Sequence, residues 1–271
     1  MQYIDKTNTK YVLRGHQIVD TFIKGQWQEE THKYVNLNYK TFRIDEMVAL
    51  TIEEQGGYCC YCMRELNNMP KSRNVTLEHV IPNKTKVEAV YNKYICYGAL
   101  DAGHVVFGGN IDKTQQLKLP PYPHFVAYEN LVASCNGKLI EEGSAVISLH
   151  HCCNNKRKSD EIVPLFFLPN VSELITYAPD GSIAYDEIYK KTIHDILNLD
   201  HKTLVLFRRG WCSICNLYSV EDVKNGLTDS DLRWDIVLDS KLPYTDQETL
   251  LNDIYWELFS EFGWFHSYYK N

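Results

Sequence analysis

The sequence lacks any long apolar run, and no stretch approaches the roughly 18 consecutive apolar residues that a membrane-spanning helix needs. Its first residues lack the apolar segment and the cleavage-site pattern of a secretory signal peptide. Internal repeats and low-complexity tracts are also missing. Because 44% of the 271 residues are apolar and 23% are charged, we expect a globular cytoplasmic protein with no membrane partner.

The chain also has no excess of positive charge, since 35 acidic residues outweigh 28 Lys and Arg residues to give a net charge of −7. Proteins that bind nucleic acid without a partner are usually basic, because Lys and Arg release counterions from the phosphates. Here basic residues gather only locally, at 156–158 and at 208–209. This pattern favours delivery to a substrate by a partner protein, although overall charge says little about one small cleft.

Cysteine is abundant, and the count of nine is odd. A secreted disulfide scaffold would be shorter and would usually have an even count, so close pairs favour metal binding in a reducing cytosol. Cys59 and Cys62 have the two-residue gap that lets two thiolates reach one zinc ion. Cys135 and either Cys152 or Cys153 complete a four-cysteine site, and we prefer Cys152. Two others, Cys60 and Cys96, equally suit a role as small buried apolar residues.

A second CxxC pair, Cys212 and Cys215, has no further pair near it in the sequence. We interpret it as structural, with a redox pair or half of another zinc site as alternatives. Aromatic residues gather after it, near the end of the chain, and favour either a core or a partner-binding surface. They are Trp256, Phe259, Phe262, Trp264, Phe265, Tyr268 and Tyr269.

The pattern of apolar residues predicts an α+β protein in three regions: a helical extension at 1–50, a central domain at 51–165 with an irregular insertion at 83–128, and a mixed α/β region at 166–271. Turn residues and caps locate the elements. We predict a helix ending at Gly56, strands at 75–81 and 131–134, a helix start at 150–160, a hairpin at 175–185, a helix capped by Asp200, and a final helix from Thr245 to Gly263.

Between the two halves of the cysteine site lies a candidate for chemistry, Glu78 followed by His79. Neighbouring strand residues face opposite ways, but Pro82 ends this strand, so that both side chains can reach one cleft. An imidazole can take a proton from water near neutral pH, and a carboxylate suits Mg²⁺ or Mn²⁺. Taken alone, the pair equally fits an ordinary strand end.

Together these segments resemble the HNH endonucleases. The likeness rests on four motifs in the family's order: Cys59 to Cys62, Glu78 to Pro82, Asn130 to Val132, and His151 to Lys156. The family has a ββα-metal core, in which one strand ends in a base histidine and a helix donates a metal ligand. The resemblance covers roughly residues 50–165, although Cys135 and Cys152 are further apart than in simple family members.

The resemblance implies a metal-dependent nuclease with structural zinc and catalytic Mg²⁺ or Mn²⁺. His79 would activate water, and Glu78 with Asn155 would hold the catalytic ion, with Asn154 as the alternative ligand. Asn130 would orient the His79 ring through a hydrogen bond. The basic run Lys156, Arg157 and Lys158 would bind phosphates.

A narrower likeness, to HNH proteins of bacterial anti-phage operons, rests on residues 132–137, 179–181 and 192–199. These proteins include PtuB-like subunits of Septu and related retron systems. The likeness implies an ABC-type ATPase partner (PtuA-like), with a retron reverse transcriptase and its RNA as further partners. Two other hypotheses stay open, a zinc-folded adaptor without catalysis and a thiol-redox protein.

Overall fold

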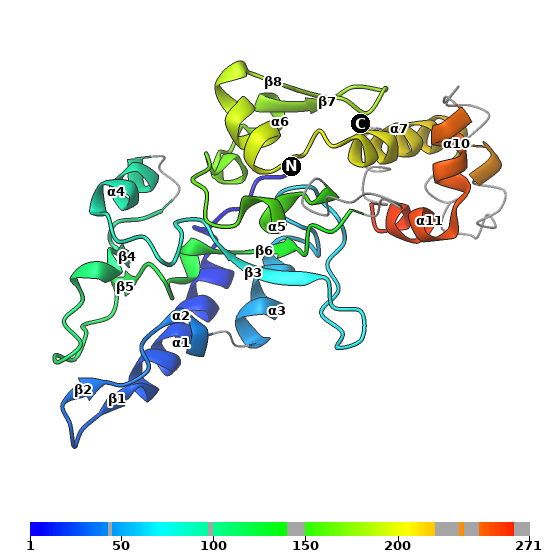
Figure 1. Ribbon diagram of the computed structural model, residues 1–271. Helices are drawn as coiled ribbons and strands as arrows, with labels where there is room; N and C mark the ends of the chain where they lie inside the picture. Colours follow the sequence, from blue (N-terminus) through cyan, green and yellow to red (C-terminus); the bar gives the residue numbers. More distant parts are fainter. Residues whose placement is uncertain (43–44, 97–99, 140–149, 220–232, 236–243, 263–271) are drawn as a thin grey trace. The chain divides into compact units, whose positions relative to one another are not determined.

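The computed structural model describes residues 1–42, 45–96, 100–139, 150–219, 233–235 and 244–262 (Figure 1). The chain forms two compact units that interleave along the sequence. The first comprises Met1–Cys60, Leu66–Asn136 and Lys158–Val171, and the second comprises Tyr61–Glu65, Gly137–Arg157 and Ser172–Asn271. Within the described ranges, no helix has both the length and the apolar character that crossing a membrane requires.

The first unit combines helices with two-stranded sheets, so the class is a mixture of helix and strand. Its helices are α1 (Thr9–Gly25), α2 (Tyr39–Phe42), α3 (Asp45–Glu54) and α4 (Glu88–Cys96), with 3-10 turns η1 (Gly108–Asn110), η2 (Tyr128–Asn130) and η4 (Leu165–Phe167). The antiparallel pairs are β1 (Trp27–Gln28) with β2 (Lys33–Tyr34) and β3 (Val75–His79) with β6 (Leu131–Cys135). A parallel pair joins β4 (Val105–Val106) to β5 (Tyr122–Pro123).

The second unit has one β-hairpin and several helices. Its elements are α5 (Cys153–Arg157), β7 (Ile175–Tyr177), β8 (Ile183–Tyr185), η5 (Glu187–Tyr189), a π-helical turn η6 (Lys191–Ile196), α7 (Lys202–Leu217), α10 (Tyr244–Leu251) and α11 (Asp253–Ser260). A short helix, α6, spans Val171–Leu174. Figure 1 shows the hairpin and the long α7 of this unit.

The buried face of α1 contributes Val19, Phe22 and Ile23 to the core of the first unit. The Phe22 ring packs against Phe42 at 4.9 Å between centroids. The opposite face of α1 is held by ion pairs, in which Lys10 and Arg14 both contact Glu53 on α3. An apolar face opposite a charged one explains why this segment forms a surface helix.

The core of the second unit centres on α7 and α11. Trp211 stacks on Phe259 at 5.1 Å between ring centroids, and its indole N–H donates to the Phe259 carbonyl at 3.1 Å. The hairpin turn reaches α7 at Gly181, where a Cβ would lie 2.0 Å from the Val205 carbonyl oxygen. Arg208 completes this packing by donating to the Gly181 carbonyl at 3.0 Å.

Several predicted elements are confirmed. The helix before Gly56 is α3, the two strands are β3 and β6, and the hairpin is β7 with β8. Inside the predicted irregular insertion at 83–128, the described residues include α4, β4 and β5.

One predicted helix cap is wrong, and one predicted helix is divided in two. Asp200 does not cap α7, because the side chain of His201 accepts from the Thr203 amide and Asp200 instead contacts His194 at 2.5 Å. The final helix is two helices, since Asn252 caps α11 directly after α10. Its predicted end at Gly263 and the aromatic residues from Trp264 onward lie outside the described residues.

Candidate functional site

The site is built on the antiparallel β3–β6 pair, and its candidate residues lie at opposite ends of this pair. Val75 pairs with Cys135 at one end, and His79 pairs with Leu131 at the other. Because a strand rises about 3.3 Å per residue, the histidine and the cysteine lie roughly 13 Å apart along the sheet. The pair therefore separates a thiol end from an imidazole end.

Gln55 attaches the first cysteine turn to the outer edge of β6. Its side-chain nitrogen donates to the carbonyls of Tyr58 and Ala133, each at 2.8 Å, and its oxygen accepts from the Ala133 amide at 2.7 Å. The amide of Cys60 also donates to the Ala133 carbonyl at 3.1 Å. Gln55 is completely buried, so it takes the place of a neighbouring strand along this edge and fixes the turn that carries the cysteines.

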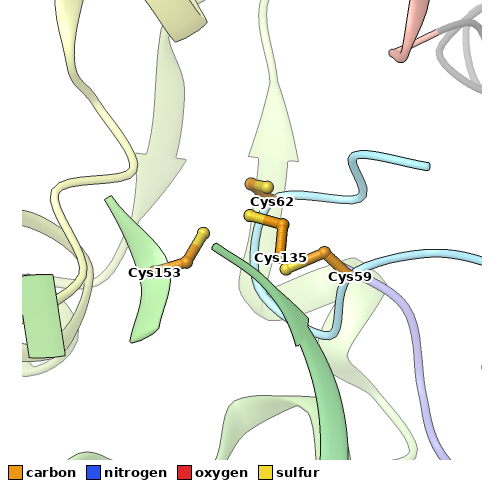
Figure 2. A group of neighbouring side chains, drawn as sticks. All are labelled: Cys59, Cys62, Cys135 and Cys153. Carbon is orange, nitrogen blue, oxygen red and sulfur yellow. The ribbon is translucent and has the colours of Figure 1, made fainter. Parts of the chain in front are cut away.

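Four cysteines converge at the thiol end. The sulfur atoms of Cys59, Cys62, Cys135 and Cys153 all lie within 4.8 Å of one another, and all four residues are buried. Figure 2 shows these side chains meeting from the cysteine turn, the end of β6 and the start of α5. Tetrahedral zinc with Zn–S bonds of about 2.3 Å needs sulfur atoms about 3.8 Å apart. The four residues fit a metal ion such as zinc.

The fourth member of the cluster is Cys153, which corrects the preference for Cys152. Cys153 begins α5 with a left-handed φ of +53°, and its amide donates to the Leu197 carbonyl at 2.9 Å. Cys152 lies beside it, with its sulfur 3.5 Å from that of Cys153. Cys153 is the one of the two whose sulfur lies within 4.8 Å of all three other sulfurs.

Cys60, Cys212 and Cys215 are not members of this group. Burial, together with neighbouring Cys59, raises the pKa of the Cys60 thiol well above its usual range, which favours the neutral thiol. Cys212 and Cys215 lie on α7 with both side chains buried. Their place inside a core helix supports the structural interpretation. Cys96 ends α4.

At the imidazole end, two groups hold the ring of His79. Its Nε2 lies 3.0 Å from the Phe125 carbonyl oxygen, and the Tyr39 ring meets it edge-on at 4.1 Å between centroids. Tyr39 is itself fixed by its hydroxyl, which donates to the Leu77 carbonyl at 2.9 Å. Because a carbonyl only accepts, this contact favours the tautomer with hydrogen on Nε2 and the lone pair on Nδ1.

Asn130 does not make the predicted hydrogen bond to His79. Its oxygen accepts from the Ile81 amide at 2.6 Å, and its nitrogen donates to the carbonyls of Ile81 and His124 at 3.0 Å and 2.7 Å. Both amide hydrogens are thereby used. Asn130 instead joins the chain just after β3 to the chain just before Phe125, and so positions the carbonyl that contacts His79.

The remaining predicted residues are divided between the two units. Glu78 is buried on β3 in the first unit. Asn154 and Asn155 lie on α5 in the second unit, and both side chains are half-buried. A carboxylate and an amide oxygen are both hard donors that suit Mg²⁺ or Mn²⁺.

The basic run is not a uniform phosphate-binding surface. Lys158 is exposed and Lys156 is half-buried. Arg157 is completely buried and donates to the Tyr61 hydroxyl at 3.0 Å, which corrects the prediction that it binds phosphates. Arg157 is the last residue of α5, and Lys158 follows it outside the helix with a left-handed φ of +54°.

Sequence reasoning missed several residues that build this site, namely Tyr39, Gln55 and the Phe125 carbonyl. None belongs to a recognisable motif, and a backbone carbonyl carries no sequence pattern. Comparison with models of known protein families finds no match for this chain, and comparison with curated proteins finds no similar sequence.

Proposed function

We propose that this chain is an HNH-type endonuclease that hydrolyses phosphodiester bonds in nucleic acid. The observation that carries the proposal is the held ring of His79 at the end of β3, with its Nε2 on the Phe125 carbonyl and its edge on Tyr39. An imidazole fixed in one tautomer is suited to general-base chemistry. The four-cysteine cluster, at the other end of the same strand pair, would hold this framework in shape.

In this proposal His79 acts through Nδ1. The Phe125 carbonyl keeps hydrogen on Nε2, so Nδ1 takes the proton from the attacking water, and the oxygen of that water attacks phosphorus as the 3′-oxygen departs. The same carbonyl then stabilises the protonated ring. Asn130 supports the contact between His79 and the Phe125 carbonyl, because its hydrogen bonds fix the backbone at Ile81 and at His124.

Two kinds of metal ion belong to the proposal. Zinc held by four thiolates is structural, because four ligands leave no position for water. Mg²⁺ or Mn²⁺ held by Glu78 and Asn155 would supply charge stabilisation at the phosphate. Lys156 and Lys158 would contact neighbouring phosphates without reading the bases.

Partner dependence rests on charge. With a net charge of −7, the chain offers little general attraction for polyanions. We therefore infer that a partner protein brings it to DNA or RNA. The resemblance to HNH proteins of anti-phage operons makes an ABC-type ATPase the expected partner, in a reducing cytoplasm where thiolates stay available to zinc. In a retron-type complex, the reverse transcriptase and its RNA would be further partners.

The test is cleavage of labelled DNA and RNA panels by the wild type and His79→Ala, with Mg²⁺, Mn²⁺ or EDTA, alone and beside the ATPase. We expect metal-dependent cutting that falls by about 100-fold or more in the variant, the usual size of a general-base contribution. His194→Ala is the matched control, because it removes an exposed imidazole paired with Asp200. Equal cutting by wild type and His79→Ala would contradict the proposal.

The burial of both Glu78 and His79, which are 7% and 6% exposed, favours a second candidate, a zinc-folded adaptor that carries no catalysis. In that case the wild type would cut no substrate under any condition while remaining folded with zinc. His79→Ala would then also keep full biological activity.

A further inference from the structure

A second cluster of metal-binding side chains lies in the first unit, apart from the cysteines. One ring nitrogen each of His16 and His104 and a carboxylate oxygen of Glu129 all lie within 4.8 Å of one another. His16 belongs to α1, His104 precedes β4, and Glu129 lies in η2. Glu129 Oε1 is 2.5 Å from His16 Nε2 and 3.2 Å from His104 Nδ1.

The packing of α1 against η2 brings these residues together. Gly15 has no side chain, and a Cβ there would lie 2.3 Å from Cγ of Tyr128. This close approach places the next residue, His16, beside Glu129, which follows Tyr128. This contact between α1 and η2 therefore requires glycine at position 15, because any side chain there would overlap Tyr128.

Tyr122 fixes the side of the cluster next to β5. Its ring lies 4.8 Å from the His16 ring, and its hydroxyl donates to Asp20 at 2.9 Å. Its backbone amide donates to the His104 carbonyl at 2.7 Å. The two imidazoles then meet edge to face at 4.9 Å between centroids. Tyr122 therefore packs against the His16 ring and anchors the backbone of His104.

The carboxylate of Glu129 supplies an independent indication that a ligand belongs here. Glu129 is only 2% exposed, and within the described residues its Oε2 is buried without a hydrogen-bond partner. A buried carboxylate is costly unless cations or donors compensate it. The side chain of His104 is 36% exposed, so an ion has a route from solvent to this carboxylate.

We propose that His16, His104 and Glu129 form a binding site for a divalent first-row transition metal ion. Two imidazoles and one carboxylate suit Fe²⁺, Co²⁺, Ni²⁺ or Zn²⁺ better than Mg²⁺, which prefers oxygen ligands. Binding displaces the hydrogen shared by Nε2 of His16 and Oε1 of Glu129, and the proton leaves to solvent. Three protein ligands leave further positions for water or a substrate group.

The test is calorimetric titration of Co²⁺ into the full chain whose cysteine site already holds zinc. We expect one additional binding event, weakened about 10-fold or more in His104→Gln and in Glu129→Gln. His194→Gln is the matched control, because His194 and Asp200 form a similar histidine–carboxylate pair that belongs to no three-ligand group among the described residues. It should bind Co²⁺ as the wild type does.

Absorption spectra of the same samples identify the ligands. Cobalt at nitrogen and oxygen gives weak bands, whereas cobalt that replaces zinc among thiolates adds intense sulfur-to-metal charge transfer. Equal Co²⁺ affinity in the wild type and both variants, or an event with thiolate bands, would overturn the proposal. Thermal melting without metal checks folding, and His104→Gln keeps the test decisive, because this partly exposed side chain can be changed with little effect on the core. Nuclease activity does not enter the readout.

Discussion

Gly15 and Tyr128 touch so closely that the backbone of α1 rests on the aromatic ring, and a Cβ at Gly15 would overlap three of the side-chain atoms of Tyr128. Tyr128 cannot easily yield. It is completely buried, and its hydroxyl bonds to Glu54, which also pairs with Lys6 at 2.6 Å.

We expect Gly15→Ala to lower the free energy of unfolding by about 1–3 kcal/mol, because the extra methyl group forces α1 away from η2. The measurement is urea denaturation at equilibrium. Gly25→Ala is the matched control in the same helix, since a Cβ there meets nothing within 4 Å. If both substitutions changed the free energy of unfolding equally, the close packing of Gly15 against Tyr128 would not explain the loss of stability.

Cys153→Ser and Cys152→Ser should differ in zinc content. Only the sulfur of Cys153 lies in the four-cysteine cluster, so we expect its loss to leave three sulfur ligands and to weaken zinc binding by about 10-fold or more. Cys152→Ser should retain about one equivalent of zinc. Elemental analysis after dialysis against a chelator makes the comparison, and the reverse order would restore Cys152 as the ligand.

Arg157→Met and Lys158→Met should act on different properties. Arg157 is buried against the Tyr61 hydroxyl, so its replacement should destabilise the fold by about 2–3 kcal/mol. Lys158 is exposed, so its replacement should leave stability within about 0.5 kcal/mol and weaken binding to nucleic acid. Chemical denaturation and a binding titration at fixed salt separate the two effects. A stable Arg157→Met protein with reduced binding would contradict this assignment.

Stability should fall as the solution becomes acidic, in part because of His124. Burial lowers the pKa of this imidazole to about 4, from a usual value near 6.5. The folded state therefore binds fewer protons than the unfolded chain between these values. Stability is complete above pH 6.5 and is lost as the pH falls toward 4, by up to about 3 kcal/mol.

His124→Gln tests this assignment, because glutamine still offers an oxygen to the Gly108 amide that now donates to Nδ1 at 2.9 Å. The unfolding free energies of the two proteins, measured between pH 7 and pH 4.5, should differ in slope, with the wild type steeper. Parallel slopes would assign the acid sensitivity to other groups.

The strands and the cysteine turn were predictable because their rules are local. A β-rich run that ends at Pro82 indicates β3, and the short run from Leu131 to Ser134 indicates β6. A two-residue gap between Cys59 and Cys62 indicates one turn. The two-part final helix was not predicted, because one apolar stripe runs through both halves. Asn252, whose side chain accepts from the Ile254 amide, restarts the helix.

Two features of the site depend on rotation about a helix axis and escaped the sequence. Cys152 and Cys153 are chemically identical neighbours, and only the backbone turn at Cys153 decides which one faces the other sulfurs. Arg157 looks like part of a basic run until the direction of its side chain is known. The histidine cluster was missed for another reason, since His16, His104 and Glu129 come from three distant segments that share no motif.

The order of the clustered cysteines along the chain has a consequence for synthesis on the ribosome. Cys59 and Cys62 emerge early, Cys135 follows much later, and Cys153 comes last. A nascent chain that stops before Cys153 carries only three of the four clustered thiols, and such a set leaves a position open to water or to a competing ligand. Complete metal capture thus waits until about half of the chain has been made, and products terminated before Cys153 would stay loosely folded and open to proteolysis.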